Sequence, residues 1–426
     1  QRDVLVALPT DRDRAALRGA PPADYQLHWV DDEDFAYPEP TPAFGMIDYT
    51  ERCSRYVDRH DIDGVLYSHD IANLVAGVLC DRHDLPGPSL EAMFRTNHKY
   101  YSRQYQPESI WTDYIDLETG EWGDREPEFP CYVKPPLLTM TILQHAVDSP
   151  DELDTALNVI RREMPTWTDI FHEFFAEYLD TDQYPLATED IVVVEKQMTD
   201  WTQHCVEGWV DPDGEIHVWA VSDQNYYSER LAVDNYATPS RLPADTQQKL
   251  KEVAIGTVRR HGIEQGFWNV EIWRQDDEYT VTEINGRAAS VWRTLYEGTF
   301  GSSIYDAVLH LSCNDGAQVA AEAPDITPGD PDRVGGQFHV VTFGEGAADE
   351  LFDFAAARAM DQPDIEVFVD EDETIEQTRT SGVWLARFHL FGPDHDTILG
   401  RANEIRETLL KQPETSPEPN LATSPG

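Results

Sequence analysis

The chain has 426 residues, 40% of them hydrophobic, which is enough for a sizeable core and for two or three domains. It carries 80 acidic residues against 32 basic ones, and the net charge of -48 argues against nucleic acid or an anionic membrane as a general partner. The acid is spread along the whole length, which favours a globular surface adapted to a very salty cytoplasm, as in an extreme halophile. A merely acidic mesophilic protein is the alternative.

The cysteines indicate a reduced intracellular protein. There are five of them, they are scattered, and no two are spaced as Cys-x-x-Cys, so a structural zinc site is not expected. No apolar run reaches the roughly 18 residues that span a membrane, and the first residues predict strand, turn and helix rather than a signal peptide. We therefore expect a soluble, cytoplasmic protein.

The first hundred residues alternate short apolar strands with amphipathic helices, as in an open parallel α/β sheet. Strands are expected within 3–9, 25–30 and 63–70, and helices within 11–19, 49–61 and 72–87. The first turn, Pro9 to Arg14, lacks Gly-x-Gly-x-x-Gly, so a dinucleotide fingerprint is absent. An N-terminal α/β domain over residues 1–95 follows.

From about Phe129 the pattern changes to mixed α and β elements. A strand at 129–136 precedes two helices, 149–164 with Ser149 as N-cap and 166–179. Further strands are expected at 190–198, 203–210 and 215–222, then a helix at 242–262 that ends on Gly262. A hairpin over 267–287 turns at residues 275–278.

The last hundred residues predict a small α+β unit after a Pro/Gly/Asp-rich linker near 323–333. Its strands are expected at 336–343, 365–370 and 383–392, and its helix at 396–412, which gives a C-terminal domain over 334–412. Residues 413–426 have the composition of a disordered tail.

The second strand of the hairpin gathers oxygen ligands. Alternation places Val281, Glu283 and Asn285 on one face, with Arg287 just beyond. Glu271 can oppose Glu283 at roughly 5 Å on the neighbouring strand. Glu271, Glu283 and Asn285 can then share one divalent cation or bridge two, and all-oxygen ligands favour Mg²⁺ or Mn²⁺ over zinc. The alternative is a solvated face of an acidic protein.

Lysine is rare, with six residues in the chain, and three of the six lie at notable places. Lys99 is on a helix one turn before Arg103, Lys134 ends a strand, and another strand ends on Glu195 and Lys196. Lysines from different elements suit phosphate oxygens, and a strand that leaves its sheet offers free backbone groups to a flat base. Ordinary surface lysines are the alternative.

In this order the pieces resemble the ATP-grasp superfamily, over about residues 63–311. Members show a Lys before the central domain, a Lys ending the strand "VKP", a Glu-Lys hinge after an apolar strand, and an acidic residue followed by Glu-x-Asn-x-Arg. The resemblance is to the carboxylate-amine ligase and biotin-carboxylase-like branch. It implies an α/β fold with an N-terminal pre-ATP-grasp domain, a central ATP-grasp α+β domain over 96–322 with a lid at 129–200, and the small C-terminal domain.

The resemblance also implies roles for single residues. Lys99 and Lys134 would hold the α- and β-phosphates of ATP, and Arg287 would face the transferring phosphoryl group or the acyl phosphate. The adenine hinge would be Glu195, Lys196, Gln197 and Met198. The magnesium (or manganese) ligands would be Glu271, Glu283 and Asn285.

Two departures from the family pattern stand out. The segment "PPLLTMTILQHAVDSP" after Lys134 has no glycine where the family carries a Gly/Ser-rich loop, so phosphate cover would rest on Thr139, Thr141 or backbone groups. The acidic residue expected to hold the ribose aligns with Gln203, which leaves Asp200 as a substitute.

The expected activity is that of an ATP-dependent ligase. A carboxylate is phosphorylated to an acyl phosphate, an amine attacks it, and ADP and phosphate are released. Partners are then small-molecule carboxylates and amines, with no nucleic acid and no membrane, and a homodimer is one possible assembly. Open alternatives are biotin-carboxylase-like bicarbonate activation, a non-catalytic nucleotide-binding protein and an acidic structural protein.

Overall fold

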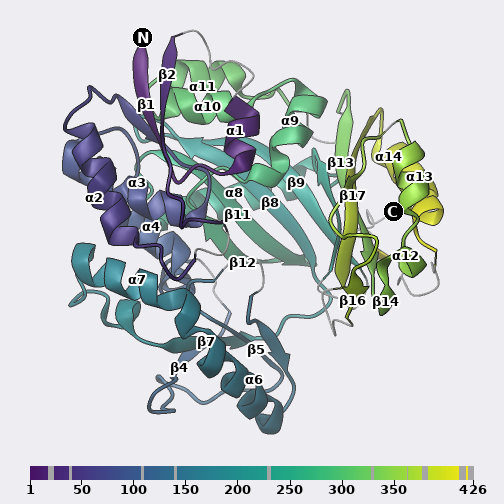
Figure 1. Ribbon diagram of the computed structural model, residues 1–426, viewed down its shortest axis with the longest axis horizontal. Coiled ribbons are helices and arrows are strands. Elements are labelled where there is room, and N and C mark those ends of the chain that lie inside the picture. Colours follow the sequence, from purple (N-terminus) through teal and green to yellow (C-terminus); the bar gives the residue numbers. More distant parts are fainter. Residues whose placement is uncertain are drawn as a thin grey trace.

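The computed structural model describes residues 1–17, 24–37, 41–106, 110–138, 142–227, 232–327, 331–361, 363–376, 382–411 and 419–420. Figure 1 shows a large central sheet with the N-terminal unit and a second small sheet on one side and the C-terminal unit on the other. Thr139, Thr141 and most of the expected disordered tail, residues 413–418 and 421–426, lie outside the described residues.

The N-terminal unit is the parallel α/β sheet that the sequence predicts. Its strand order is β2-β1-β3, with β1 paired in parallel to both neighbours. The elements are β1 (Arg2–Ala7), α1 (Asp11–Leu17), β2 (Tyr25–Val30), α2 (Met46–Val57), β3 (Gly64–Leu66) and α3 (Asp70–His83). The His69 side chain caps α3 by accepting a hydrogen bond from Ala72 N. Two short helices, α4 (Leu90–Asn97) and α5 (Lys99–Tyr105), lead out of the unit.

A second sheet of four antiparallel strands lies at the bottom of Figure 1, in the order β4-β7-β5-β6. Its elements are β4 (Thr112–Asp116), β5 (Cys131–Lys134), β6 (His145–Val147), α6 (Pro150–Glu163), α7 (Pro165–Tyr178), the 3-10 turn η1 (Pro185–Thr188) and β7 (Ile191–Lys196). As expected, Ser149 caps α6 by accepting from Glu152 N. Apolar side chains of β4, β5, β7 and α6 form a core of their own.

The central sheet runs β12-β11-β8-β9-β10-β13-β17-β15, and β18 (Pro419–Asn420) pairs with β9. Its first part consists of β8 (Thr202–Val210), β9 (Ile216–Tyr227), β10 (Val233–Thr238), β11 (Gly266–Gln275) and β12 (Glu278–Asn285). Helix α8 (Ala244–His261) packs on one face and ends, as expected, at Gly262 with φ 74°. The other face is covered by η2 (Ser290–Trp292), α9 (Arg293–Phe300), α10 (Ile304–Leu311) and α11 (Gly316–Glu322).

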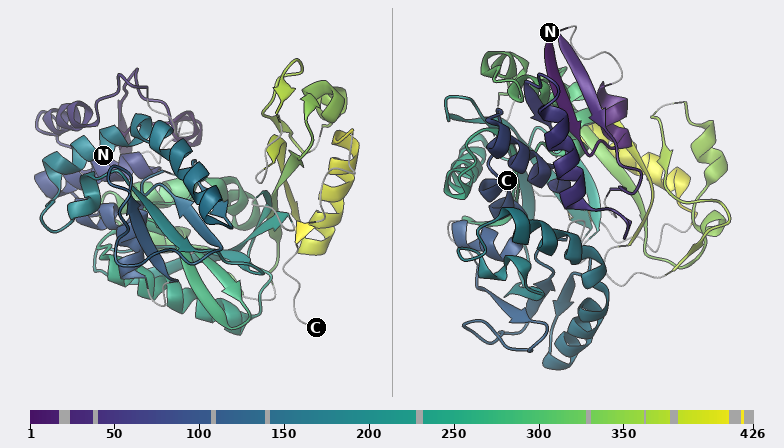
Figure 2. Two further views of the ribbon diagram at one scale, coloured as in Figure 1. Left: turned by 90° about the horizontal axis from the view of Figure 1, so that it is seen from below. Right: turned by 60° about the vertical axis from the view of Figure 1, so that its left-hand side comes forward.

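The C-terminal strands continue this sheet, because β13 (Val334–Thr342) pairs with β10. The α+β content is as expected, but the longer strands extend the central sheet, and two short strands, Gly346–Ala347 and Thr374–Ile375, pair in a small sheet of their own. The unit stands to one side of the molecule (Figure 2) and has a core drawn from residues 334–410. Its other elements are β14 (Gly346–Ala347), α12 (Ala348–Leu351), α13 (Phe354–Ala359), β15 (Glu366–Val367), β16 (Thr374–Ile375), β17 (Val383–Gly392) and α14 (His395–Leu409).

Candidate active site

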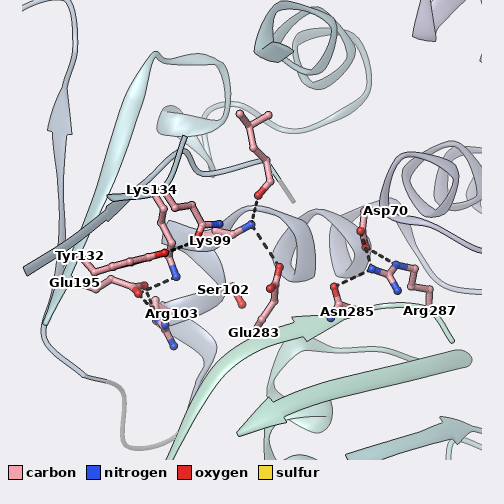
Figure 3. A network of polar contacts seen from close by, with 12 residues as sticks. Asp70, Lys99, Ser102, Arg103, Tyr132, Lys134, Glu195, Glu283, Asn285 and Arg287 are labelled. Carbon is pink, nitrogen blue, oxygen red and sulfur yellow. Dashed lines mark hydrogen bonds and ion pairs between the residues drawn. The ribbon is translucent and has the colours of Figure 1, made fainter. Parts of the chain in front are cut away.

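The predicted site residues come together where the four-stranded sheet, the helix α5 and the hairpin β11–β12 meet. Figure 3 shows three groups of polar contacts side by side: Lys134 with Glu195, Lys99 with Glu283, and Asn285 with Arg287 and Asp70. Lys99 is 8% exposed and Lys134 is 7% exposed. The alternative of ordinary surface lysines is therefore wrong for both.

Glu195 is held by two cations. Lys134 Nζ lies 2.8 Å from Glu195 Oε2, and Arg103 donates from Nε to Oε1 at 2.6 Å and from Nη2 to Oε2 at 3.0 Å. Burial raises the pKa of Glu195, but Arg103 and Lys134 outweigh it and lower that pKa to about 2. Burial lowers the pKa of Lys134 to about 8, although the negative charge of Glu195 acts to raise it. We call Lys134, Glu195 and Arg103 the balanced group.

The segment after Glu195 leaves the sheet as the hinge prediction requires. Lys196 ends β7 and is exposed, and its backbone N–H donates to Trp111 O at 3.0 Å. The Gln197 side-chain oxygen is buried without a hydrogen-bond partner among the described residues. The Met198 carbonyl accepts from Trp201 Nε1 at 3.1 Å, and Trp201 stacks on Trp273 with centroids 4.3 Å apart. A flat aromatic surface therefore lies beside the segment.

Lys99 links the loop after β5 to the hairpin. Its Nζ donates to Leu138 O at 2.7 Å and lies 3.4 Å from Glu283 Oε1. Because α5 begins at Lys99, the side chain projects from the first residue of the helix. The ammonium is thus fixed beside one of the predicted metal ligands.

The hairpin places its acidic residues in register, with one correction. Glu271 pairs with Glu283 and Asn269 with Asn285, whereas Ile272 pairs with Val281, so Thr282 is an extra residue in a β-bulge. Val281 consequently packs in the core with Ile272, and its predicted place on the face of Glu283 is wrong. The bulge also lets Thr282 Oγ1 donate to Glu271 O at 3.1 Å.

Glu271 is not on a solvated face, which was the alternative reading of this hairpin. Burial, and next to it the charge of Glu283, raise the pKa of Glu271 to about 8. Two neighbouring carboxylates with an amide oxygen at Asn285 are a donor set that fits Mg²⁺ or Mn²⁺. Within the described ranges, no cluster of three or more His, Cys, Asp or Glu residues is arranged to hold a metal. The amide is therefore a necessary part of the predicted set.

Arg287 makes a two-point ion pair that the sequence analysis did not foresee. Its Nε and Nη2 donate to the two carboxylate oxygens of Asp70 at 2.7 and 2.8 Å, and Nη2 also lies 3.4 Å from Asn285 Oδ1. Asp70 is the first residue of α3, 217 positions away, and is buried. Burial raises the pKa of Asp70, but Arg287 outweighs it and the pKa is lowered.

Gln203 lies in the site, and Asp200 does not. Gln203 Nε2 donates to Glu271 and, at 3.0 Å, to Gln224 Oε1, while Gln203 Oε1 accepts from Trp273 Nε1 at 2.8 Å. Asp200 is an exposed turn residue with φ 56°. Of the two residues weighed for the ribose, Gln203 is the one that the fold brings to the acidic pair.

A second residue missed by sequence reasoning is Glu207 on β8. It is buried and accepts hydrogen bonds from Ala289 N at 2.5 Å and from Tyr296 Oη at 2.9 Å. Burial raises its pKa to about 8. Because Ala289 is two residues after Arg287, Glu207 anchors the loop that carries the guanidinium. The one sequence signal for Glu207 is its position four residues after Gln203 on an alternating strand, which puts both side chains on the same face of the sheet.

Comparisons with known proteins agree with this architecture. The family description of the ATP-grasp domain matches residues 127–295. A search of curated proteins gave no match. No described helix is long and apolar enough to cross a membrane.

Solved structures are similar along nearly the whole chain. An L-amino acid ligase from Bacillus licheniformis is 15% identical with a TM-score of 0.72, over 96% of this chain and 98% of that one. A phosphoribosylglycinamide synthetase from Anaerococcus prevotii is 15% identical with a TM-score of 0.60, over the same shares. A carboxyaminoimidazole ribonucleotide synthase from Aspergillus clavatus, complexed with ATP, is 14% identical with a TM-score of 0.62, over 96% and 98%. At these identities the likeness shows the fold.

Proposed function

We propose that the chain is an ATP-dependent ligase of the ATP-grasp superfamily that joins a small-molecule carboxylate to an amine; the match of the ATP-grasp domain to residues 127–295 supports this. The proposal takes the domain boundaries as 1–95, 96–322 with a lid at 129–200, and 334–412. The apolar core of residues 334–410 supports the last boundary. The core of the four-stranded sheet also includes Ile115 and Leu117, and it supports a lid that starts before residue 129. A homodimer and a cytoplasmic location remain predictions.

In the first step a substrate carboxylate oxygen attacks the γ-phosphorus of ATP, the bond to the β-phosphate oxygen breaks, and ADP leaves. In this proposal Lys134 and Lys99 bind phosphate oxygens, and the segment from Glu195 to Met198 receives the adenine. Glu271, Glu283 and Asn285 would hold Mg²⁺ or Mn²⁺, which supplies charge neutralisation at the phosphates. Lys99 lies beside Glu283, so its ammonium is close to the proposed metal ligands and to the phosphoryl group that would be transferred.

In the second step the amine nitrogen attacks the acyl carbon, the carbon–oxygen bond to phosphate breaks, and the nitrogen loses a proton. The product is an amide, and inorganic phosphate leaves. No side-chain nucleophile is needed, because positioning and charge neutralisation carry the reaction. In this proposal Arg287 stabilises the transferring phosphoryl group, and Glu207 positions the loop of Arg287 by accepting a hydrogen bond from Ala289 N.

The observation that carries the proposal is that charged and polar side chains from distant elements meet at the end of β12. Lys99 from α5 reaches Glu283, and Asn285 and Arg287 follow on the same strand end. Elements distant in the sequence thus bring an ammonium, a guanidinium and oxygen ligands to one place. This set suits phosphoryl transfer better than it suits a structural role.

The test separates the kinetic role of Arg287 from its ion pair with Asp70. Hydroxylamine serves as the amine, and the hydroxamate formed from a panel of carboxylates with ATP and Mg²⁺ is measured. We expect Arg287→Ala to lower turnover by about 10²–10³ and also to lower stability, because it leaves Asp70 buried and unpaired. The double variant Asp70→Asn/Arg287→Ala should regain stability without regaining turnover. Recovery of turnover in the double variant would contradict the catalytic role.

Two observations favour a second candidate, a nucleotide-binding protein without turnover. Asp70 occupies two donors of Arg287, and Gln203 stands where the family has an acidic residue. The same panel decides between the two. ATP binding with no hydroxamate from any carboxylate would support the non-catalytic protein.

A further inference from the structure

A pocket opens beside the candidate active site, between the N-terminal unit and α7. The space between its atoms amounts to about 490 Å³, a figure that includes the open mouth. It lies between the start of α3, the end of α4, the loop after β5 and the first turns of α7. Figure 1 shows α7 beneath the N-terminal helices α2 and α3.

The walls of the pocket are mostly apolar. Ile71 and Leu74 come from α3, Leu137 from the loop after β5, and Trp167 and Phe171 from α7. The two aromatic residues are four positions apart on one helix, so both rings lie on the face that borders the pocket. A wall of this kind binds branched aliphatic or aromatic groups and excludes water.

The pocket adjoins the reacting groups at two points. Asp70 lines it and binds Arg287, and Leu138 lines it while its carbonyl accepts from Lys99 Nζ. A carboxylate located between Arg287 and Lys99 would therefore direct its substituent toward α7. The pocket lining and the contacts of the proposed phosphorylation site therefore share Asp70 and Leu138.

The charge of the pocket lining limits the kind of substituent that the substrate can place there. Asp70 is the sole charged residue among the described lining residues, and Arg287 already neutralises it. A second carboxylate placed here would find no described cation on the lining, and a polar chain would lose hydrogen bonds to water. An uncharged, apolar group is the one that gains from transfer into this space.

We propose that this pocket selects the carboxylate substrate, and that the substrate carries a branched aliphatic or aromatic group bound against Ile71, Leu74, Trp167 and Phe171. The proposal rests on the proposed ligase function and specifies its substrate class. The amine is not constrained by it.

The experiment uses the full chain with ATP, Mg²⁺ and hydroxylamine, and compares 3-phenylpropionate, propionate and succinate. We expect kcat/KM for 3-phenylpropionate to exceed that for propionate by about tenfold or more, with succinate lowest. Ile142→Trp, which fills the pocket from a partly buried lining position, should lower the 3-phenylpropionate value about tenfold and leave propionate nearly unchanged. The matched control is Val367→Trp, at an exposed position on β15, which should change neither.

A second variant and a binding measurement keep the outcomes distinct. Trp167→Ala should improve bulkier carboxylates relative to 3-phenylpropionate. Equal use of all three carboxylates, or an equal loss for all in Ile142→Trp, would overturn the pocket assignment while the ligase function stood. If no carboxylate gives hydroxamate, the ligase function fails. Calorimetry of 3-phenylpropionate with a non-hydrolysable ATP analogue then decides: binding lost in Ile142→Trp supports the pocket, and no binding overturns it.

Discussion

Two buried glutamates of the candidate site, Glu195 and Glu207, face opposite surroundings. Both are at most 3% exposed, yet the pKa of Glu195 is about 2 and that of Glu207 about 8. Burial acts in the same direction on each, so the neighbours make the difference. Glu195 has Arg103 and Lys134 at bonding distance, whereas Glu207 has one backbone N–H and one tyrosine hydroxyl.

The contrast divides the site into two functional halves. In the balanced group, the buried carboxylate of Glu195 stays ionised because two cations bind it. Its ion pair with Lys134 fixes that ammonium at the end of β5. The second half comprises Glu207 and Glu271 on the central sheet, and both have raised pKa values. Ionising these carboxylates is unfavourable unless a cation binds beside them. In the proposed reaction, Lys134 of the first half would bind phosphate, and the oxygen ligands of the second half would hold the metal ion.

The largest expected effect comes from breaking the balanced group. Arg103→Met leaves Glu195 buried with one cation, and we expect the free energy of unfolding to fall by about 3–5 kcal/mol. Denaturant unfolding measures the change. The matched control is Arg125→Met, whose ion pair with Glu128 is exposed and should contribute under about 1 kcal/mol. Equal losses in the two variants would show that Glu195 does not depend on Arg103.

The next effect concerns the nucleotide. Lys134→Ala should weaken the binding of ATP with Mg²⁺ by about 1.5–3 kcal/mol, because a charge-assisted contact is lost. Calorimetry without a carboxylate substrate measures it, with Lys249→Ala as the control at an exposed lysine. Unchanged affinity in Lys134→Ala would leave this lysine with a structural role only.

The smallest expected effect is on the pH dependence of stability, and it tests Glu207 on the central sheet. The folded-state pKa of Glu207, about 8, lies above its ordinary value of 4.5, so its protonated form supports the fold and stability is lost as pH rises toward 8. Glu207→Gln keeps the acceptor oxygen and does not ionise. We expect the thermal midpoint of the variant, relative to the parent protein, to rise from pH 6 to pH 9. A difference that stayed constant over this range, as we expect for exposed Glu118→Gln, would mean that Glu207 is charged in the fold.

Local patterns were sufficient to predict part of this site. Lys134 at a strand end, the exit of the chain after Glu195 and the register of Glu271 with Glu283 all depend on a few neighbouring residues. Asp70 was missed because its partner Arg287 is 217 positions away. Val281 was misplaced because a single bulged residue inverts the alternation, and no local signal marks Thr282 as that residue.

The same limit applies to the fold. The parallel N-terminal sheet and the helix ends at Ser149 and Gly262 follow from periodicity and capping residues. The pairing of β13 with β10 joins strands about a hundred residues apart, and edge-to-edge pairing of this kind has no pattern in either strand. Long-range partners, rather than element types, are what the sequence alone did not reveal.

That pairing has a mechanical consequence. A continuous ladder of hydrogen bonds couples the C-terminal unit to the floor of the active site, so the two rotate as one rigid plate. The four-stranded sheet shares no described strand with the central sheet and has an apolar core of its own. The balanced group joins the two parts, because Arg103 on α5 binds Glu195 on β7. We therefore expect a movement of the four-stranded sheet away from the hairpin to break this buried ion pair.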